Sequence, residues 1–281
     1  MRGRIKPVLS AAACIVGALF LWGFWWEPSS LRVSEQCTAV KWNLEKPLRI
    51  AVLGDLHVGS PFNGLDKLNQ IVEQTNAATP DLICVLGDFV VQGVVGGTYI
   101  VPELMMPTLS RLKARYGVFA VLGNHDVWLD AGRVERALEA AHIEVLEDRA
   151  VKIPIANESI WLAGISDFWT RRHNVHAALA SVNDTTTPVV VLTHNPDVFP
   201  DVPGRVTLTL SAHTHGGQVR LPIIGAPIVP SKYGQRFAAG HIVENGRHLF
   251  VTTGIGTSII PVRFRVPPTI DVLTVGASCG G

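Results

Sequence analysis

Asp, Asn and His residues follow directly on five short apolar runs of the chain. The runs end in Asp55-Leu56-His57, in Asp88, in Asn124-His125-Asp126, in His194 and in His213-Thr214-His215. Each run has the length and composition of a buried strand, and α/β sheets build their sites at the carboxyl ends of their strands. Residues i and i+2 of an extended segment point to the same side, so Asp55 and His57, like His213 and His215, can aim two side chains at one place. We therefore expect these side chains to gather at one sheet edge.

The types of these side chains are those of metal ligands. Imidazole is combined with carboxylate and amide oxygens and without thiolate, which suits Mn, Fe or Zn in a catalytic site better than a structural zinc. One ion needs fewer ligands than the set offers, so we expect two divalent metal ions, held by Asp55, His57, Asp88, Asn124, His194, His213 and His215. Asp or Asn after Gly is also an ordinary turn residue, and a lone histidine is usually structural. That simpler interpretation requires a separate coincidence at the end of every run.

The elements that must position these residues change character along the chain. In the first half we expect strands at 48–53, 81–86 and 118–122, alternating with helices at 65–77, 103–114 and 131–141. This alternation is typical of an α/β fold. The second half is richer in β-branched and aromatic runs, which predict strands at 151–155, 160–165, 189–192, 206–210 and 248–252 and one helix at 174–182.

The N-terminal segment has the pattern of a membrane anchor. An uncharged stretch runs from Val8 to Trp26, close to the roughly 20 residues that a helix needs to cross a bilayer. Arg2, Arg4 and Lys6 precede it, and tryptophans gather at its far end, where indole rings favour the membrane interface. The positive-inside rule predicts a single-pass anchor with a cytoplasmic N-terminus. A cleaved signal peptide is the alternative, but its apolar core is shorter and ends at a small-residue site.

These features predict five segments. They are a cytoplasmic basic segment at 1–7, the transmembrane anchor at 8–26, a polar connector at 27–46, a globular catalytic domain at 47–275 and a tail at 276–281. The four cysteines form no CxxC motif; Cys14 and Cys84 lie in apolar runs, whereas Cys37 and Cys279 flank the domain and could pair in an oxidising compartment.

Composition excludes two classes of protein. With 47% hydrophobic and 17% charged residues, the chain is too apolar to stay disordered. A net charge of +1 provides no surplus of Lys and Arg for nucleic-acid binding, and no sequence feature indicates an obligate protein partner.

The ordered motifs resemble those of the calcineurin-like metallophosphoesterases, especially their membrane-anchored bacterial branch. The resemblance extends from about Arg49 to Leu273 and includes the segments Tyr116–Asp126, His213–Gln218 and Gly254–Phe264. It implies a four-layer α/β/β/α sandwich with the metals at its rim. In the chain, this domain would follow an N-terminal transmembrane helix.

The resemblance also implies roles for the site residues. It assigns Asp55, His57, Asp88 and His215 to one ion, and Asp88, Asn124, His194 and His213 to the other, so that Asp88 bridges the two. A hydroxide shared by the ions would attack phosphorus, while His125 protonates the leaving oxygen and Asp126 orients His125. Two residues depart from the family pattern: Ala212 stands where Gly is usual, and Thr269 where this branch usually has Glu.

The expected function is that of a dinuclear metal phosphohydrolase, most simply a phosphodiesterase, at the bacterial cytoplasmic membrane. Its domain would lie on the extracytoplasmic side, and a phosphate ester, with lipid-linked phosphates or diphosphates as candidates, would be its substrate. A metal-dependent amidohydrolase is one alternative, but its His-x-His pair ordinarily comes early in the chain, whereas here it comes last. A non-catalytic scaffold is the other, but that class typically has lost ligands, and here every position is filled.

Overall fold

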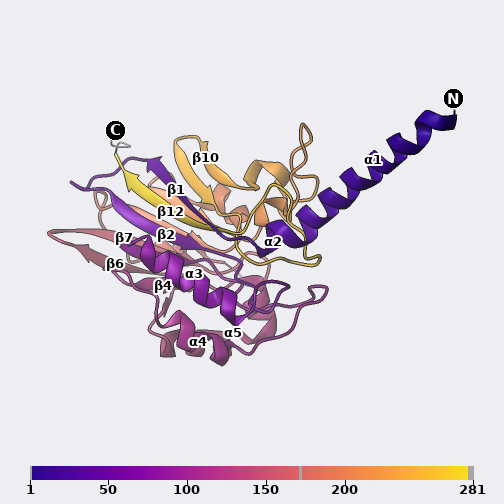
Figure 1. Cartoon of the computed structure of the whole chain (residues 1–281). Helices are drawn as coiled ribbons and strands as arrows, with labels where there is room; N and C mark the ends of the chain where they lie inside the picture. Colours follow the sequence, from indigo (N-terminus) through magenta and orange to yellow (C-terminus); the bar gives the residue numbers. More distant parts are fainter. Residues whose placement is uncertain (1, 171–172, 278–281) are drawn as a thin grey trace.

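Two six-stranded sheets pack face to face, and helices cover their outer faces (Figure 1). This computed structural model describes residues 2–170 and 173–277, with side chains from Ser10 onward. The first sheet has the order β1 (Arg32–Ala39), β12 (Thr269–Gly276), β2 (Leu48–Leu53), β3 (Leu82–Val85), β4 (Val118–Ala120) and β5 (Glu144–Val145). The second has the order β10 (Gly240–Glu244), β11 (Arg247–Val251), β9 (Leu208–Ser211), β8 (Val189–Thr193), β7 (Glu158–Ile165) and β6 (Arg149–Ile155).

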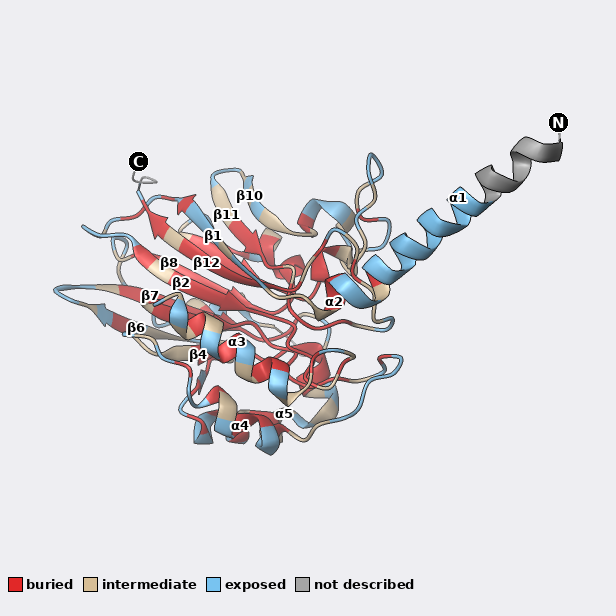
Figure 2. Ribbon diagram, in the orientation of Figure 1, coloured by how far each residue is buried: buried red, intermediate tan, exposed pale blue. Residues whose placement is uncertain are grey.

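The pleat of the central strands divides the core into layers. In β2, Ile50 and Val52 face the second sheet and belong to the core between the sheets, whereas Ala51 and Leu53 face the helices. Alternate residues of a strand point to opposite faces, so a strand that is apolar throughout is buried on both sides. Figure 2 shows the resulting buried interior.

Helices form the two outer layers. The helices α3 (Leu65–Ala77), α4 (Pro102–Leu109) and α5 (Asn124–Ala140) cover the first sheet with residues such as Ile71, Met105 and Leu138. The second sheet is covered by the short helix α6 (Val175–Leu179) and by the 3₁₀ turns η2 (Pro196–Asp201) and η4 (Gly234–Phe237), where Phe199 and Phe237 pack. The predicted four-layer sandwich is confirmed, with a thin fourth layer.

The parallel strands direct the chain to one edge. Strands β2, β3 and β4 are parallel neighbours in the first sheet, as are β7, β8 and β9 in the second. The segments that leave these strands therefore emerge together within each sheet.

Two helix boundaries differ from the prediction. The helix expected at 103–114 ends at Leu109, because the Asn76 side chain donates to the carbonyl of Arg111 and accepts the backbone N–H of Lys113, which turns the chain away. The helix expected at 131–141 begins earlier, at Asn124, and has non-helical torsion angles at Asp130. By contrast, the predicted bounds 48–53 and 65–77 are those of β2 and α3.

The segment predicted as a polar connector, 27–46, contains a strand. Strand β1 pairs in parallel with β12 over its whole length, from Arg32 opposite Thr269 to Ala39 opposite Gly276. Most of its residues are exposed, since it is an edge strand, so it lacks the apolar alternation by which strands are recognised. The strands β5, β10 and β12 were not predicted either.

A helical rod precedes the sandwich. It consists of α1 (Arg2–Leu21), a π-helical turn η1 (Trp22–Trp26) and α2 (Glu27–Ser29). By length and composition, Ser10–Ser29 is a candidate membrane span, and most of it is exposed as it projects from the domain (Figure 2). The predicted anchor at 8–26 overlaps this stretch.

The cysteines follow the prediction as far as the structure describes them. Cys84 is buried in β3 and Cys14 is exposed on α1. Cys279 lies outside the described residues, so its pairing with Cys37 stays a prediction.

Candidate metal centre

The predicted ligands converge where the carboxyl ends of the two sheets meet. Asp55 and His57 follow β2, Asp88 follows β3, Asn124 opens α5 after β4, His194 follows β8, and His213 and His215 follow β9. All of these residues are buried. Ligands from the two sheets are in direct contact: His194 Nε2 lies 3.2 Å from Asp88 Oδ2.

The backbone at these ligands is not extended. The φ angle is 49° at Asp55, 39° at His57, 55° at Asp88, 70° at His213 and 50° at His215, in the left-handed region. Such conformations are costly for residues other than glycine and are retained mainly at functional sites. The chain therefore turns at these five ligands, so the extended geometry assumed for residues i and i+2 was wrong, although Asp55 and His57 do join one group of donors as predicted.

The consequence is clearest for the last two histidines. His215 Nε2 lies 3.3 Å from His57 Nε2 and 3.8 Å from Asp55 Oδ1. His213 instead directs Nδ1 to His194 Nε2, at 3.1 Å. His213 and His215 thus belong to different groups of donors and do not point to one place as predicted.

The donor atoms form two main groups. One combines Asp55, His57 and His215, and the other combines Asp88, His194 and His213; within each, the atoms lie within 4.8 Å of one another. Asn124 extends the second group, because its Oδ1 is 3.1 Å from His194 Nε2. A third group of the same size places His125 beside His57 and Asp88.

The hydrogen-bond pattern fits cations between these side chains. His57 Nδ1 faces the carbonyl of Val90 at 3.1 Å, and His194 Nδ1 faces the carbonyl of Leu86 at 2.7 Å. A carbonyl only accepts, so each Nδ1 carries a proton and each ring, in the neutral form that binds a metal, directs an Nε2 lone pair to the site. Asp88 Oδ2 faces both Nε2 atoms, at 3.5 Å from His57 and 3.2 Å from His194. Acceptors facing acceptors fit divalent metal ions, and the carbonyls fix the tautomers that such ligands need.

The electrostatics agree with this arrangement. Burial opposes the charged form of His194, but the Asp88 carboxylate raises its pKa to about 10, so His194 Nε2 holds a proton beside Asp88 at the place that a bound cation would take. Burial likewise opposes ionisation of Asp88, yet His194 holds the pKa of that carboxyl well below its usual range. Burial lowers the pKa of His57 to about 4 and that of His213 to about 3, which leaves both rings neutral and available as donors.

His125 lies beside the ligands with one nitrogen unused. Its ring packs edge-on against His57, with centroids 4.7 Å apart, and Nδ1 is buried without a hydrogen-bond partner among the described residues. Its backbone N–H donates to Asp88 Oδ1 at 2.8 Å. The side chain is thus held at the site while its nitrogen remains available.

Asp126 does not orient His125, contrary to the prediction. Its carboxylate accepts the backbone N–H groups of Gly123, Asp88, Phe89 and Val90, at 2.8–3.3 Å. Burial and the neighbouring Asp88 charge raise the pKa of Asp126 to about 7. Asp126 therefore shapes the loop that carries Asp88.

Sequence reasoning gave no role to Arg263, which is fully buried under the site. Its guanidinium donates to the carbonyls of Thr253, Gly256 and Val266, and Nη2 lies 3.5 Å from His215 Nδ1. Burial lowers its pKa to about 10, so it remains charged at neutral pH. A buried arginine that binds several carbonyls supports the loop beneath His215, and its place in the segment 254–264 was the available signal.

The two departures from the family pattern are accommodated locally. The methyl group of Ala212 lies opposite Gly54, where an added Cβ would come within 2.7 Å of Ala212 Cβ. Thr269 donates its hydroxyl to the carbonyl of Pro267 at 2.8 Å, at the start of β12 and outside the ligand set.

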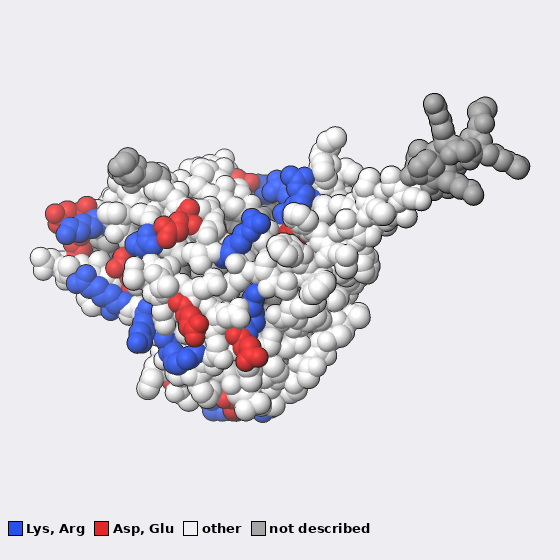
Figure 3. All heavy atoms as spheres, in the orientation of Figure 1, with Lys and Arg blue, Asp and Glu red and all other residues white. Residues whose placement is uncertain are grey.

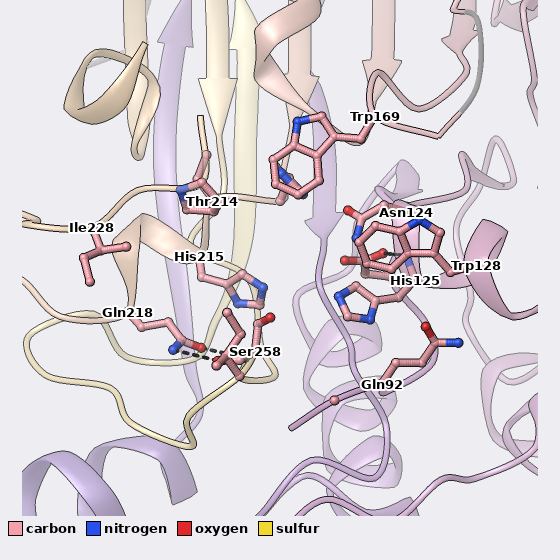
Figure 4. A pocket seen from close by; sticks show the side chains of 16 residues that line it. Gln92, Asn124, His125, Trp128, Trp169, Thr214, His215, Gln218, Ile228 and Ser258 are labelled. Carbon is pink, nitrogen blue, oxygen red and sulfur yellow. Dashed lines mark hydrogen bonds between the residues drawn. The ribbon is translucent and has the colours of Figure 1, made fainter. Parts of the chain in front are cut away.

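A cavity of about 300 Å³ opens onto the ligands. Figure 4 shows His125, Trp128 and Asn124 on one side of it, His215 and Ser258 on the other, and Trp169 above. The Trp169 ring packs edge-on against His213, with centroids 4.2 Å apart. The cavity therefore has a polar floor with apolar and aromatic walls, which suits a ligand with a charged head and an apolar part.

Comparison with known proteins identifies the family. The model of the calcineurin-like phosphoesterase family matches residues 48–217, more than half of the chain. The uncharacterized metallophosphoesterase YkuE of Bacillus subtilis is 29% identical over 276 residues, which cover 95% of this chain and 93% of the relative. The phosphodiesterase YaeI of Escherichia coli is 31% identical over 233 residues, which cover 81% and 82% of the two chains.

A solved structure supports the fold. The NAD nucleotidase of Haemophilus influenzae superposes with a TM-score of 0.50 at 13% identity, over 74% of this chain and 45% of that protein. Since the match of residues 48–217 and the two relatives agree with the geometry of the site, the chain belongs to the calcineurin-like metallophosphoesterase family and is a phosphoric ester hydrolase.

Proposed function

We propose that this protein is a membrane-anchored, dinuclear metal phosphodiesterase. The observation that carries the proposal is the convergence of buried donors into two groups at the floor of one cavity. Asp55, His57 and His215 would hold one ion, and Asn124, His194 and His213 the other. Asp88 would serve both, since its Oδ2 faces histidines of each group.

The chemistry follows from this donor set. Two divalent ions held there would polarise a phosphate ester and lower the pKa of water, as phosphoester hydrolysis requires. Oxygen and imidazole donors suit Mn, Fe or Zn. The ligands at the floor of the cavity are buried, and electrostatic interactions are stronger where bulk water is excluded.

His125 is the proposed proton donor to the leaving oxygen. Its Nδ1 is buried without a partner, and its side chain lines the cavity. Burial lowers the pKa of His125, opposed in part by Asp88. The backbone bond to Asp88 holds the ring next to the proposed ions, so a leaving group in the cavity would be within reach.

The substrate class is a phosphodiester, with lipid-linked phosphates or diphosphates as candidates. A relative is named a phosphodiesterase, and the apolar walls of the cavity suit an ester with an apolar group. The N-terminal helix would tether the enzyme in the membrane, and the basic residues before it favour a cytoplasmic N-terminus, with the domain on the outer side.

The test uses the full chain in nanodiscs, with metal analysis and a panel of substrates. We expect two divalent ions per chain and faster hydrolysis of bis(p-nitrophenyl) phosphate than of p-nitrophenyl phosphate or of a p-nitroanilide amide. A chelator should abolish activity, and added Mn²⁺ or Zn²⁺ should restore it. Metal-loaded protein that cleaves only the monoester or only the amide would overturn the phosphodiesterase assignment.

A further inference from the structure

Isoleucines are exposed on two loops beside the cavity. Ile223, Ile224 and Ile228 lie on the loop 221–230, and Ile259 and Ile260 lie on the loop 256–264. Ile223 is fully exposed, and the exposed fractions of Ile228 and Ile259 are 78% and 69%. Scattered exposed hydrophobic residues are common, but a contiguous set beside a site indicates an interaction surface.

The backbone of these loops adds to the cost of the isoleucines. The φ angle is 69° at Ile223 and 61° at Ile259. A β-branched residue is strongly disfavoured in this region, which glycine or asparagine adopts readily. Because neither side chain is buried, intramolecular packing does not account for their presence.

The N-terminal helix is fixed to the same loops. The backbone N–H of Arg263 donates to the carbonyl of Gly23 at 2.9 Å, and Glu27 accepts the N–H of Val266 and the indole N–H of Trp22. Figure 1 shows the loop after β9 projecting on the side of the domain from which α1 leaves.

Further hydrogen bonds join the two loops to each other. Gln218 donates its side-chain amide to the carbonyls of Ser258 and Ile260, both at 3.1 Å. Arg220 donates its N–H to the carbonyl of Phe264 at 2.9 Å. The exposed isoleucines are therefore held at the base of the candidate membrane span.

Charges are distributed as a membrane surface requires. Figure 3 shows a largely uncharged flank of the domain below the base of α1, with Lys or Arg side chains beside that base and charges of both signs over the opposite end. Arg220 directly precedes the apolar loop and lines a cavity with Arg32, the third residue after α2. Cations placed behind an apolar surface can bind lipid phosphates once that surface enters the bilayer.

We propose that the loops 221–230 and 256–264 form a bilayer-contact surface that seats the mouth of the metal cavity at the lipid interface. Ile228 and Ile259 line that cavity, so a phosphate ester carried by a lipid would reach the ligands without leaving the membrane surface. The consequence for substrate choice rests on the proposed phosphodiesterase function, whereas the contact with the bilayer does not.

The contact is tested without catalysis. A cysteine replaces Ile223 in the full chain, with Cys14→Ala, Cys37→Ser and Cys279→Ser as background so that an environment-sensitive fluorophore attaches at position 223 alone. The labelled protein is placed in vesicles of equal parts phosphatidylcholine and phosphatidylglycerol. We expect blue-shifted emission and quenching by lipid-attached nitroxides, and neither at Leu104→Cys, an exposed position on α4 (Figure 1). Emission at Ile223→Cys that is unaffected by the nitroxides would overturn the proposal, including the case of a blue shift due to a protein partner.

Activity separates this proposal from the proposed function. The variant Ile223→Glu/Ile224→Glu should hydrolyse bis(p-nitrophenyl) phosphate like the parent, while its kcat/KM on a phosphodiester lipid in the same vesicles falls at least roughly tenfold. The control Leu104→Glu should change neither rate. Equal rates of the variant and the parent on the lipid would contradict the role in substrate choice, whereas a parent inactive on both substrates would contradict the proposed function alone.

Discussion

The carboxylate of Asp126 accepts the backbone N–H of Asp88 at 2.8 Å. Asp126 thereby fixes, across 38 positions of sequence, the loop that carries the one carboxylate shared by the two proposed ions. Phe89 and Val90 of the same loop also donate their backbone N–H groups to this carboxylate, and Gly123 donates its N–H at the start of α5. The residue is a positioning residue, and it acts through Asp88.

Replacing Asp126 by Asn should therefore remove metal as well as activity. An amide has one acceptor oxygen, and its NH₂ would face N–H donors, so we expect a loss of roughly 2–4 kcal/mol in unfolding free energy. Metal content by mass spectrometry and chemical denaturation would measure both. Asp130→Asn, which alters an exposed carboxylate on the same helix, is the control and should retain metal. Full metal content in Asp126→Asn would contradict the positioning role.

Variants at His125 and Asp88 should differ in whether they lose bound metal as well as turnover. His125→Ala should lower kcat by roughly a hundred- to ten-thousand-fold, as expected for a general acid, with metal content retained. Asp88→Asn should lose both metal and turnover. A leaving group of low pKa needs little protonation, so p-nitrophenyl esters should be affected less by His125→Ala than alkyl esters. Equal loss of metal in the two variants would disprove this division of roles.

Asp271 should make stability depend on pH. Burial raises its pKa to about 6, although it accepts hydrogen bonds from Thr252 at 2.7 Å and Gln36 at 3.2 Å. The folded state thus favours the protonated form. As the pH rises from about 4 to about 6, the unfolding free energy should therefore fall by roughly 2–3 kcal/mol in total. Above about pH 6 it should no longer change because of this group.

The comparison of parent and Asp271→Asn isolates this effect. The variant should lack this decrease, because its amide does not titrate and can still accept from Thr252. Denaturation of both metal-loaded proteins across this pH range provides the difference. A difference that is independent of pH would show that Asp271 does not titrate as stated.

Substitutions at Gly54 and Ala212 should have non-additive effects on stability. A Cβ at Gly54 would lie 2.7 Å from Ala212 Cβ and 2.9 Å from Thr252 Cγ2, so Gly54→Ala should cost about 1–3 kcal/mol of stability. Adding Ala212→Gly should recover part of that loss, since one of the two clashes disappears. A double-mutant cycle measured by thermal unfolding would give the coupling energy. Strict additivity of the two substitutions would mean that the contact with Ala212 does not matter.

The sequence by itself determined the strands that deliver the ligands and the chemical types of those ligands. The runs that became β2, β3, β4, β8 and β9 are apolar enough to be recognised, because a strand buried on both faces leaves a continuous apolar pattern. The polar residues after them were visible for the same reason. The edge strand β1 was missed, because an exposed strand has no such pattern.

Only the tertiary structure gave the physical reason for the grouping of the ligands, which the family resemblance implied but the spacing of the residues did not. His57 and His215 are neighbours although 158 positions separate them, and His213 turns to His194 instead. Backbone torsion angles at the ends of the strands and the packing of the two sheets set these contacts. The sequence also did not show that Asp126 binds the loop that carries Asp88, or that the apolar loops lie at the base of α1. Local patterns record which residues are buried or turn, but contacts between distant segments arise only when the two sheets close on one core.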